Sequence, residues 1–208
     1  MTPGLRARKR AALERELART AYQLVEERGF ADVTVDDIVD AVGVARRTFS
    51  NYFSCKEEAV AAVVLHEAGT GLAAWQPPAD PQTLPSVMRD LVAHQVRVGA
   101  FIALRDLARL AREHPPLVPW FREAQWRLWS FAGARVLDAL EVTDPAYRAE
   151  VTAMVGAVFG VITSLLLPDQ GSAVSTAAPS TEDGLPNAVQ VRALVDHVLD
   201  QLDRGYRA

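Results

Sequence analysis

The chain has 208 residues, of which 50% are hydrophobic and 23% charged, and its formal net charge is −4. This hydrophobic content is sufficient for a substantial core, whereas a mean hydropathy of +0.04 argues against an integral membrane protein. The single cysteine excludes an internal disulfide, and residues 1–10 carry basic charges with no apolar stretch behind them. We therefore expect a cytoplasmic protein with no membrane partner.

The first predicted helix runs from about Arg8 to Arg28, where apolar side chains recur at helical spacing. Gly29 is expected to end this helix as its C-cap glycine, and it is followed by the apolar residue Phe30. An arm containing the basic residues Arg6 and Arg8 is expected either to follow the minor groove of DNA or to stay free in solvent. Phosphate contact is favoured over base reading, because most protein–DNA hydrogen bonds go to the backbone.

Two short helices are expected next. Thr34 can accept a hydrogen bond from the first free amides of a helix beginning at Val35, and Asp37 can complete a capping box. Gly43 follows where a helix needs a left-handed stop residue. A second helix is predicted from about Ala45 to Phe53, so the pair is typical of a helix-turn-helix.

The second of these helices carries Arg46, Arg47, Ser50 and Asn51 three or four residues apart on one face. Arginine matches the acceptors of guanine, asparagine matches adenine, and hydroxyl groups reach bases or phosphates. An isolated Arg-Arg pair is more often a solvated helix face. The two-helix pattern around it favours DNA contact, and the acidic net charge does not exclude this, since phosphate binding depends on the local surface.

Several dipeptides in this region occur at a characteristic spacing: Gly29-Phe30, Thr34-Val35, Asp37-Ile38, Gly43-Val44, Thr48-Phe49, Tyr52-Phe53 and Lys56-Glu57. Through them the segment resembles the amino-terminal domain of the TetR family of transcriptional regulators. The resemblance implies an all-α chain, with a three-helix helix-turn-helix DNA-binding domain over residues 1–55. A larger helical domain for effector binding and dimerisation would cover residues 56–208.

The resemblance also implies roles for single residues. The residues expected to contact DNA are Thr34, Arg46, Arg47, Thr48, Ser50, Asn51, Tyr52 and Lys56, with Tyr52 and Lys56 on phosphates. The chain departs from the family pattern at Ala45, Ser50 and Cys55, and Ser50 replaces an aromatic ring with a short hydroxyl that can reach a base. A redox role for Cys55 beside Lys56 is a weaker interpretation than a small residue at a helix start.

The rest of the chain is predicted to be helical. One helix should run from beyond Ser54 as far as Trp75, and the later helices are expected near residues 84–98, 100–113, 116–140, 145–167 and 188–204. Residues 168–187 are rich in Gly, Ser, Thr, Pro and Ala, so we expect a loop there.

Residues 151–167 are apolar nearly all round and include Gly156 and Gly160 four residues apart. This pattern fits a short membrane span or a buried helix. The buried helix is favoured, because the run is at the lower limit of spanning length and has no basic residues close to its ends. The resemblance implies that the last two helices form a four-helix dimer interface, for which we name Gly156, Gly160, Leu194 and Val198. A two-fold dimer would present two DNA-binding domains about one DNA turn apart, and so predicts a roughly palindromic operator.

A ligand cavity is predicted from the concentration of aromatic residues in the second domain, although core packing is the better interpretation for any single ring. The expected lining is Met88, His94, Arg97, Phe101, Arg105, Trp126, Trp129 and Phe159. Arg97 or Arg105 would suit a carboxylate or phosphate on an otherwise apolar ligand. The alternative is that either arginine is an ion-paired surface residue. Residues 45–49 and 105–116 resemble mycofactocin-type regulators, which implies acyl-CoA-like effectors; a flat multidrug-like aromatic ligand is the alternative.

The predicted function is a ligand-responsive, DNA-binding transcriptional regulator. A homodimeric repressor that a small, mostly apolar effector releases from a palindromic operator is the first choice. The alternatives are a transcriptional activator and an architectural DNA-binding protein without effector. Enzymatic activity, a metal and a cofactor are not expected, because the histidines lack ligand spacing and no pair of Glu-x-x-His motifs occurs.

Overall fold

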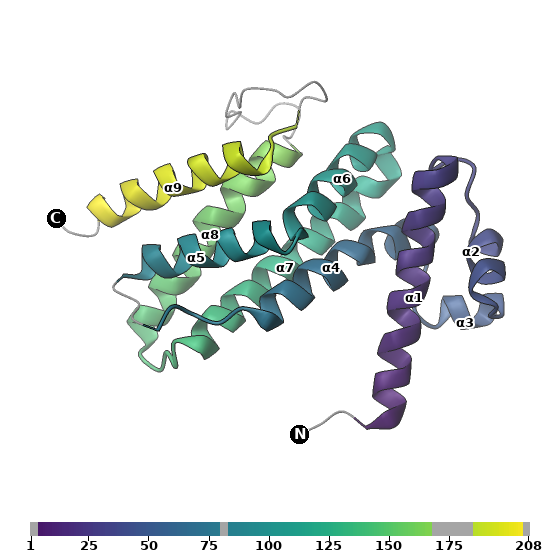
Figure 1. Ribbon diagram of the computed structural model, residues 1–208, viewed down its shortest axis with the longest axis horizontal. Coiled ribbons are helices and arrows are strands. Elements are labelled where there is room, and N and C mark those ends of the chain that lie inside the picture. The colour runs from purple at the N-terminus through teal and green to yellow at the C-terminus, as the bar shows by residue number, and fades with distance from the viewer. Residues whose placement is uncertain (1–3, 80–82, 168–184, 206–208) are drawn as a thin grey trace.

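The computed structural model describes residues 4–79, 83–167 and 185–205, and within these ranges the chain is helical and contains no strand. Figure 1 shows α1, α2 and α3 at one end and a larger helical bundle beside them, with α4 reaching from the first unit into the second. The all-α prediction is therefore confirmed. The elements are α1 (Leu5–Arg28), α2 (Val35–Val42), α3 (Arg46–Ser50), α4 (Lys56–Ala74), α5 (Leu84–Arg97), α6 (Ala100–Glu113), the 3-10 turn η1 (Pro115–Leu117), α7 (Val118–Ala139), α8 (Pro145–Leu166) and α9 (Ala188–Gly205).

Helix α1 begins earlier than predicted, at Leu5, because residues 5–10 are leucine, alanine, arginine and lysine, all strong helix formers. The expectation of an arm is therefore wrong for Arg6 and Arg8, which lie exposed on the first turns of the helix. Residues 1–3 lie outside the described residues. The helix ends at Gly29, whose φ is 88° and whose N–H donates to the carbonyl of Val25.

The predicted capping of α2 is confirmed. The Thr34 hydroxyl accepts from the Asp37 N–H at 3.2 Å, and the Asp37 carboxylate accepts from the Thr34 N–H at 2.8 Å. The Thr34 hydroxyl also donates to the Asp37 carboxylate, and this bond, followed by the bond from the Thr34 N–H, lowers the pKa of Asp37. At the other end Gly43 has the left-handed φ of 76°, and its N–H donates to the carbonyl of Val39 at 2.8 Å. The cap and the stop together fix the position of α3, which follows after a tight turn.

We expect Thr34→Ala to lower the free energy of unfolding by about 1 kcal/mol, because it removes the acceptor for a free amide at the start of α2. Urea unfolding measures the change. Thr152→Ala is the control, because Thr152 lies inside α8 and its hydroxyl donates to the Arg148 carbonyl, so it caps no free amide. Alanine is also a better helix former than threonine at such a position. A loss no larger than that of the control would contradict the capping role.

Helix α4 joins the two units and is anchored at its far end. The Trp75 indole N–H, at the end of the helix, donates to the Asp90 carboxylate at 2.9 Å, which ties α4 to α5. The Arg135 guanidinium donates to the Trp75 carbonyl at 2.7 Å, which ties the same point to α7. The Trp75 side chain is only 1% exposed. These two bonds join the end of α4 to both α5 and α7.

Helix α8 is not the fully buried helix that the sequence predicted. Val151, Val155 and Val158 face the bundle, whereas Gly160 is exposed on the opposite face. The expectation was wrong for the single chain because no other part of the described chain covers that outer face. By length and composition alone, α8 is long and apolar enough to cross a membrane. This is weak evidence for a membrane span, because the core helices of soluble proteins pass the same test. The predicted loop lies mostly outside the described residues, at 168–184.

Candidate DNA interface and ligand cavity

The short helix α3 presents polar groups outward on an apolar anchor. Phe49 is 1% exposed and Phe53 is 4% exposed, and their ring centroids lie 5.6 Å apart in the core. On the other face Arg47 and Asn51 are exposed, and Thr48 is half-buried between the two faces. Within the described ranges the Arg47 guanidinium has no ion-pair or hydrogen-bond partner. Its donors are therefore available to a ligand such as DNA.

Arg46 and Ser50 are held more closely by their own chain. The Arg46 guanidinium donates to the Asp36 carboxylate of α2 at 2.7 Å, with both side chains mostly exposed. The Ser50 hydroxyl donates to the Arg46 carbonyl at 3.2 Å. An exposed ion pair contributes at most about 1 kcal/mol, so DNA can compete for Arg46. Among the four polar residues of this face, Arg47 and Asn51 have the fewest contacts to break.

Lys56 has a different environment from the one predicted. Its ammonium donates to the carbonyls of Phe30 at 2.6 Å and Val33 at 2.7 Å, and lies 4.3 Å from the centroid of the Phe30 ring. These contacts tie the start of α4 to the α1–α2 connection and occupy two of the three N–H donors. The geometry therefore favours a structural role over phosphate contact. Tyr52 is half-buried, with the Arg10 guanidinium 5.7 Å from its ring centroid, so α1 supplies basic charge beside α3.

Cys55 is the N-cap residue of α4 and makes no capping bond with its side chain. Burial raises the pKa of its thiol, which favours the neutral thiol over the reactive thiolate. This environment agrees with a small structural residue at a helix start and argues against redox sensing.

Two contacts join the larger bundle to the DNA-binding unit near the end of α6. The Arg109 guanidinium lies 3.2 Å from the Glu26 carboxylate of α1. The His114 ring stacks on Phe30 with centroids 4.7 Å apart. Because α6 also lines the cavity described below, at Phe101, this helix touches both regions.

His66 lies half-buried on α4, and burial lowers the pKa of its imidazole below the ordinary 6.5; Glu14 and Glu67 oppose the shift, while Arg15 and Arg127 add to it. A lowered pKa in the folded state means that the unfolded chain binds the proton first as the pH falls. The stability that neutral His66 contributes is present above pH 6.5 and is lost as the pH falls through the folded-state pKa.

We therefore expect the wild-type protein to lose more free energy of unfolding than His66→Gln when the pH is lowered from about 7.5 to about 5.5. Urea unfolding at the two pH values measures the difference. His197→Gln is the control, because His197 is exposed on α9. Equal losses in all three proteins would contradict the effect of burial on His66.

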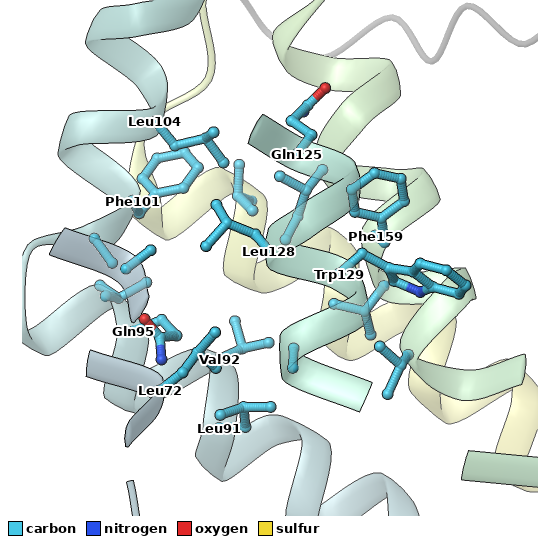
Figure 2. Close-up of a pocket in the computed structure, with 18 of the residues that line it drawn as sticks. Leu72, Leu91, Val92, Gln95, Phe101, Leu104, Gln125, Leu128, Trp129 and Phe159 are labelled. Carbon is cyan, nitrogen blue, oxygen red and sulfur yellow. The ribbon is translucent and has the colours of Figure 1, made fainter. Parts of the chain in front are cut away.

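A cavity of about 140 Å³ lies between α4, α5, α6, α7 and α8, and its wall is almost entirely apolar (Figure 2). Met88, Phe101, Trp129 and Phe159 lie in the wall, as the sequence predicted. The remaining lining residues come from the same helices and from α9: Ala68, Leu72, Leu91, Val92, Gln95, Val96, Ala100, Leu104, Gln125, Leu128, Ala132, Val155, Val158, Ile162 and Val191.

The other predicted lining residues are not in the wall. The His94 ring nitrogen Nε2 lies 3.0 Å from the Gly71 carbonyl oxygen, and Arg97 is exposed. Arg105 on α6 is half-buried outside the lining, and Trp126 is 56% exposed and packs on Trp129 with ring centroids 4.6 Å apart. The reason is helical phase: the wall of α5 follows positions 88, 91, 92, 95 and 96, so neighbouring positions point elsewhere.

Two glutamines of the wall, Gln95 and Gln125, were not predicted from the sequence. Gln125 lies four residues after Phe121 and four before Trp129, so it interrupts the apolar stripe of α7. A buried polar residue at such a position was the signal that could have identified it. No Asp, Glu, Lys, Arg or His is part of the wall in the described ranges.

Comparison with known proteins agrees with this geometry. Residues 17–63, which run from the middle of α1 into the first half of α4, match the family model described as bacterial regulatory proteins, tetR family. The HTH-type transcriptional regulator EthR of Mycolicibacterium smegmatis is 35% identical over 143 residues, or 65% of each chain, so less than two thirds of that relative is matched. The putative mycofactocin biosynthesis transcriptional regulator MftR of Mycobacterium tuberculosis is 41% identical over 49 residues, 24% of this chain and 25% of that one.

A solved structure of a putative TetR-family transcriptional regulator from Mesorhizobium loti aligns with 92% of this chain and 95% of its own, at 14% identity and a TM-score of 0.47. The relatives named here are regulators and not enzymes, in agreement with the expectation from the sequence.

Proposed function

We propose that this chain, which belongs to the TetR family of bacterial regulatory proteins by its amino-terminal domain, is a homodimeric transcriptional repressor. Residues 1–55 would bind operator DNA, and residues 56–208 would bind an effector and form the dimer. The main supporting observation is the outer face of α3, where Arg47 and Asn51 are exposed on a helix anchored by Phe49. Such a face has the size and chemistry to enter a major groove.

The cavity supports an effector that is small and mostly apolar. Filling it would press on α6, which carries Phe101 in the wall and contacts the DNA-binding unit through Arg109 and His114. A ligand that prefers the geometry unable to bind DNA lowers DNA affinity by the same factor by which DNA lowers ligand affinity. The cavity therefore favours an effector-responsive regulator over an architectural protein with a solid second domain.

The proposed dimer surface is the outer face of α8 together with α9. Small residues line this face of α8, among them Ala153 and Gly160, which are exposed, and Gly156, which is half-buried. On α9 the half-buried Leu194 and Val198 would complete the surface. Two copies related by a two-fold axis would present two α3 helices to a roughly palindromic operator.

The test is selection of the purified protein on a pool of random DNA duplexes, followed by sequencing. We expect a palindrome whose half-sites are about 10 base pairs apart, centre to centre. Salt-sensitive binding with no recovered motif would instead favour the architectural alternative. No binding in the absence of ligand would contradict the repressor. A reporter gene that carries the recovered site then distinguishes repression from activation. For a repressor, expression of the reporter should rise when the regulator is deleted.

A further inference from the structure

The wall of the cavity offers a ligand almost no hydrogen-bonding group within reach. In the described ranges, nitrogen or oxygen occurs in only three of the side chains that line it, namely Gln95, Gln125 and Trp129. Nε2 and Oε1 of Gln95, Nε2 of Gln125 and Nε1 of Trp129 are buried inside the protein and have almost no accessible surface. These side chains therefore face the cavity with their carbon atoms.

The positions of the two amide groups explain why they are out of reach. The Gln95 amide rests against Gly71 of α4, where an added Cβ would lie 2.9 Å from Oε1. Figure 2 shows the amide of Gln125 extending away from Leu91 and Val92, which lie on the other side of the cavity. A molecule in the cavity therefore meets the methylene groups of both glutamines and not their amides.

Such a wall is unfavourable for ions and for water. No ionisable side chain lines the cavity in the described ranges, so an ion would lose its hydration without gaining a counter-charge. A buried water molecule needs several polar partners, and this wall presents almost none. The volume of about 140 Å³ is close to the roughly 150 Å³ of an engineered apolar cavity that stays dry and binds benzene. A dry cavity of this size accepts a ring-sized apolar molecule.

We propose that the effector is an uncharged hydrocarbon or halogenated hydrocarbon about the size of one ring. It is held in the cavity by packing against apolar side chains such as Met88, Phe101 and Phe159, without a hydrogen bond to the protein. This assignment rests on the proposed function, because it names the chemical class of the effector at that same cavity. It excludes the carboxylate or phosphate ligands that Arg97 and Arg105 suggested in the sequence.

The experiment is calorimetric titration of the full-length protein with four probes: toluene, chlorobenzene, phenol and benzoate. Toluene and phenol have nearly the same shape, and they differ in a methyl against a hydroxyl group. We expect toluene and chlorobenzene to bind with similar affinity, and phenol at least about tenfold more weakly, because its hydroxyl leaves water and finds no partner in the wall. Benzoate should not bind, since it carries a charge.

Two alanine variants test whether the probe lies in the cavity. Ala132→Leu, on α7, adds a large side chain to the wall and should weaken toluene binding by at least about tenfold, because the added carbon atoms take up the space. Ala134→Leu is the matched control: it is the same change on the same helix, but Ala134 is exposed and lines a groove between α7 and α8 outside the cavity. Circular dichroism checks that both variants are folded. Saturating toluene should also lower the operator affinity of the wild-type protein but not that of Ala132→Leu.

Three results would overturn the assignment. The first is binding of phenol as tight as that of toluene, or any binding of benzoate, which would mean that the wall presents a polar group or accepts charge. The second is unchanged toluene binding in a folded Ala132→Leu, or its loss in Ala134→Leu alone. The third is a wild-type protein that selects a palindromic operator but does not bind toluene, or binds it without losing operator affinity. In that last case the inference fails while the proposed DNA-binding function stands.

Discussion

Arg47→Ala is expected to weaken binding to the selected operator by about 30-fold or more. An arginine that reads guanine contributes about 1–3 kcal/mol, and a two-fold dimer uses the residue twice. The structure supplies the reason for choosing it: Arg47 is exposed on the first turn of α3, and among the described residues nothing pairs with its guanidinium. Fluorescence anisotropy with a labelled operator measures the change, and the variant should also tolerate substitution at one base position of each half-site.

Arg46→Ala is the matched control for this prediction. It removes the same group from the neighbouring position, but that guanidinium is held by Asp36 at 2.7 Å, so the loss of DNA affinity should be smaller. If Arg47→Ala weakened binding equally on operator and unrelated duplexes, Arg47 would be a phosphate contact instead. If Arg46→Ala had the larger effect, the assignment of the reading residue would move to Arg46.

The parts of this fold that follow from the sequence are those decided by neighbouring residues. The capping box of Thr34 and Asp37 and the stop at Gly43 need only a few residues of chain, and all were predicted. Helix α6 and the start of α8 were likewise predicted at the observed residues, because glycine and proline mark their ends.

Contacts between residues far apart in the chain could not be predicted from local patterns. Lys56 was assigned to phosphate, which stays a prediction, and no local pattern indicated that it also donates to the carbonyls of Phe30 and Val33, more than 20 residues earlier. Periodicity identifies the apolar face of α5 but not which edge of that face meets the cavity, so Arg97 was chosen and Gln95 was missed. Likewise, α8 is apolar on a face that the described chain leaves open, and periodicity alone cannot distinguish a buried face from a dimer face.

The cavity and the DNA-binding unit are connected by two separate routes. One is α6, from Phe101 in the wall to His114 on Phe30. The other is α4, which is held at Trp75 by α5 and α7 and at Lys56 by the α1–α2 connection. The first route also reaches Glu26 of α1 through Arg109, so the contacts named here end on α1 or on the α1–α2 connection and not on α3 itself. Under the proposed function, a ligand would therefore tilt the whole unit. The proposed dimer must engage both half-sites together, so a small tilt would suffice to reduce affinity.

Gly160→Leu is expected to convert the proposed dimer to a monomer and to lower operator affinity by about 100-fold or more, because linked half-sites gain about 10²–10⁴ from effective concentration. The fold of the single chain should survive, since a Cβ added at Gly160 has no atom of the described residues within 4 Å apart from its chain neighbours and its own helix backbone. Leucine is also a better helix former than glycine. In the proposed dimer, the same side chain would instead hold the paired helices apart. Light scattering gives the mass, and anisotropy gives the affinity.

Gly160 is a better test of this surface than Gly156. A Cβ at Gly156 would lie 3.8 Å from the Trp129 indole nitrogen, so a large side chain there also presses on α7 and the cavity wall. Gly160→Ala is the control: it adds one methyl group in open space and should leave the dimer intact. A dimer of unchanged mass in Gly160→Leu would reject this face as the interface. Loss of helicity in Gly160→Leu would mean that the glycine is needed for the fold of the single chain. The proposed interface is therefore supported only if Gly160→Leu is monomeric and still helical.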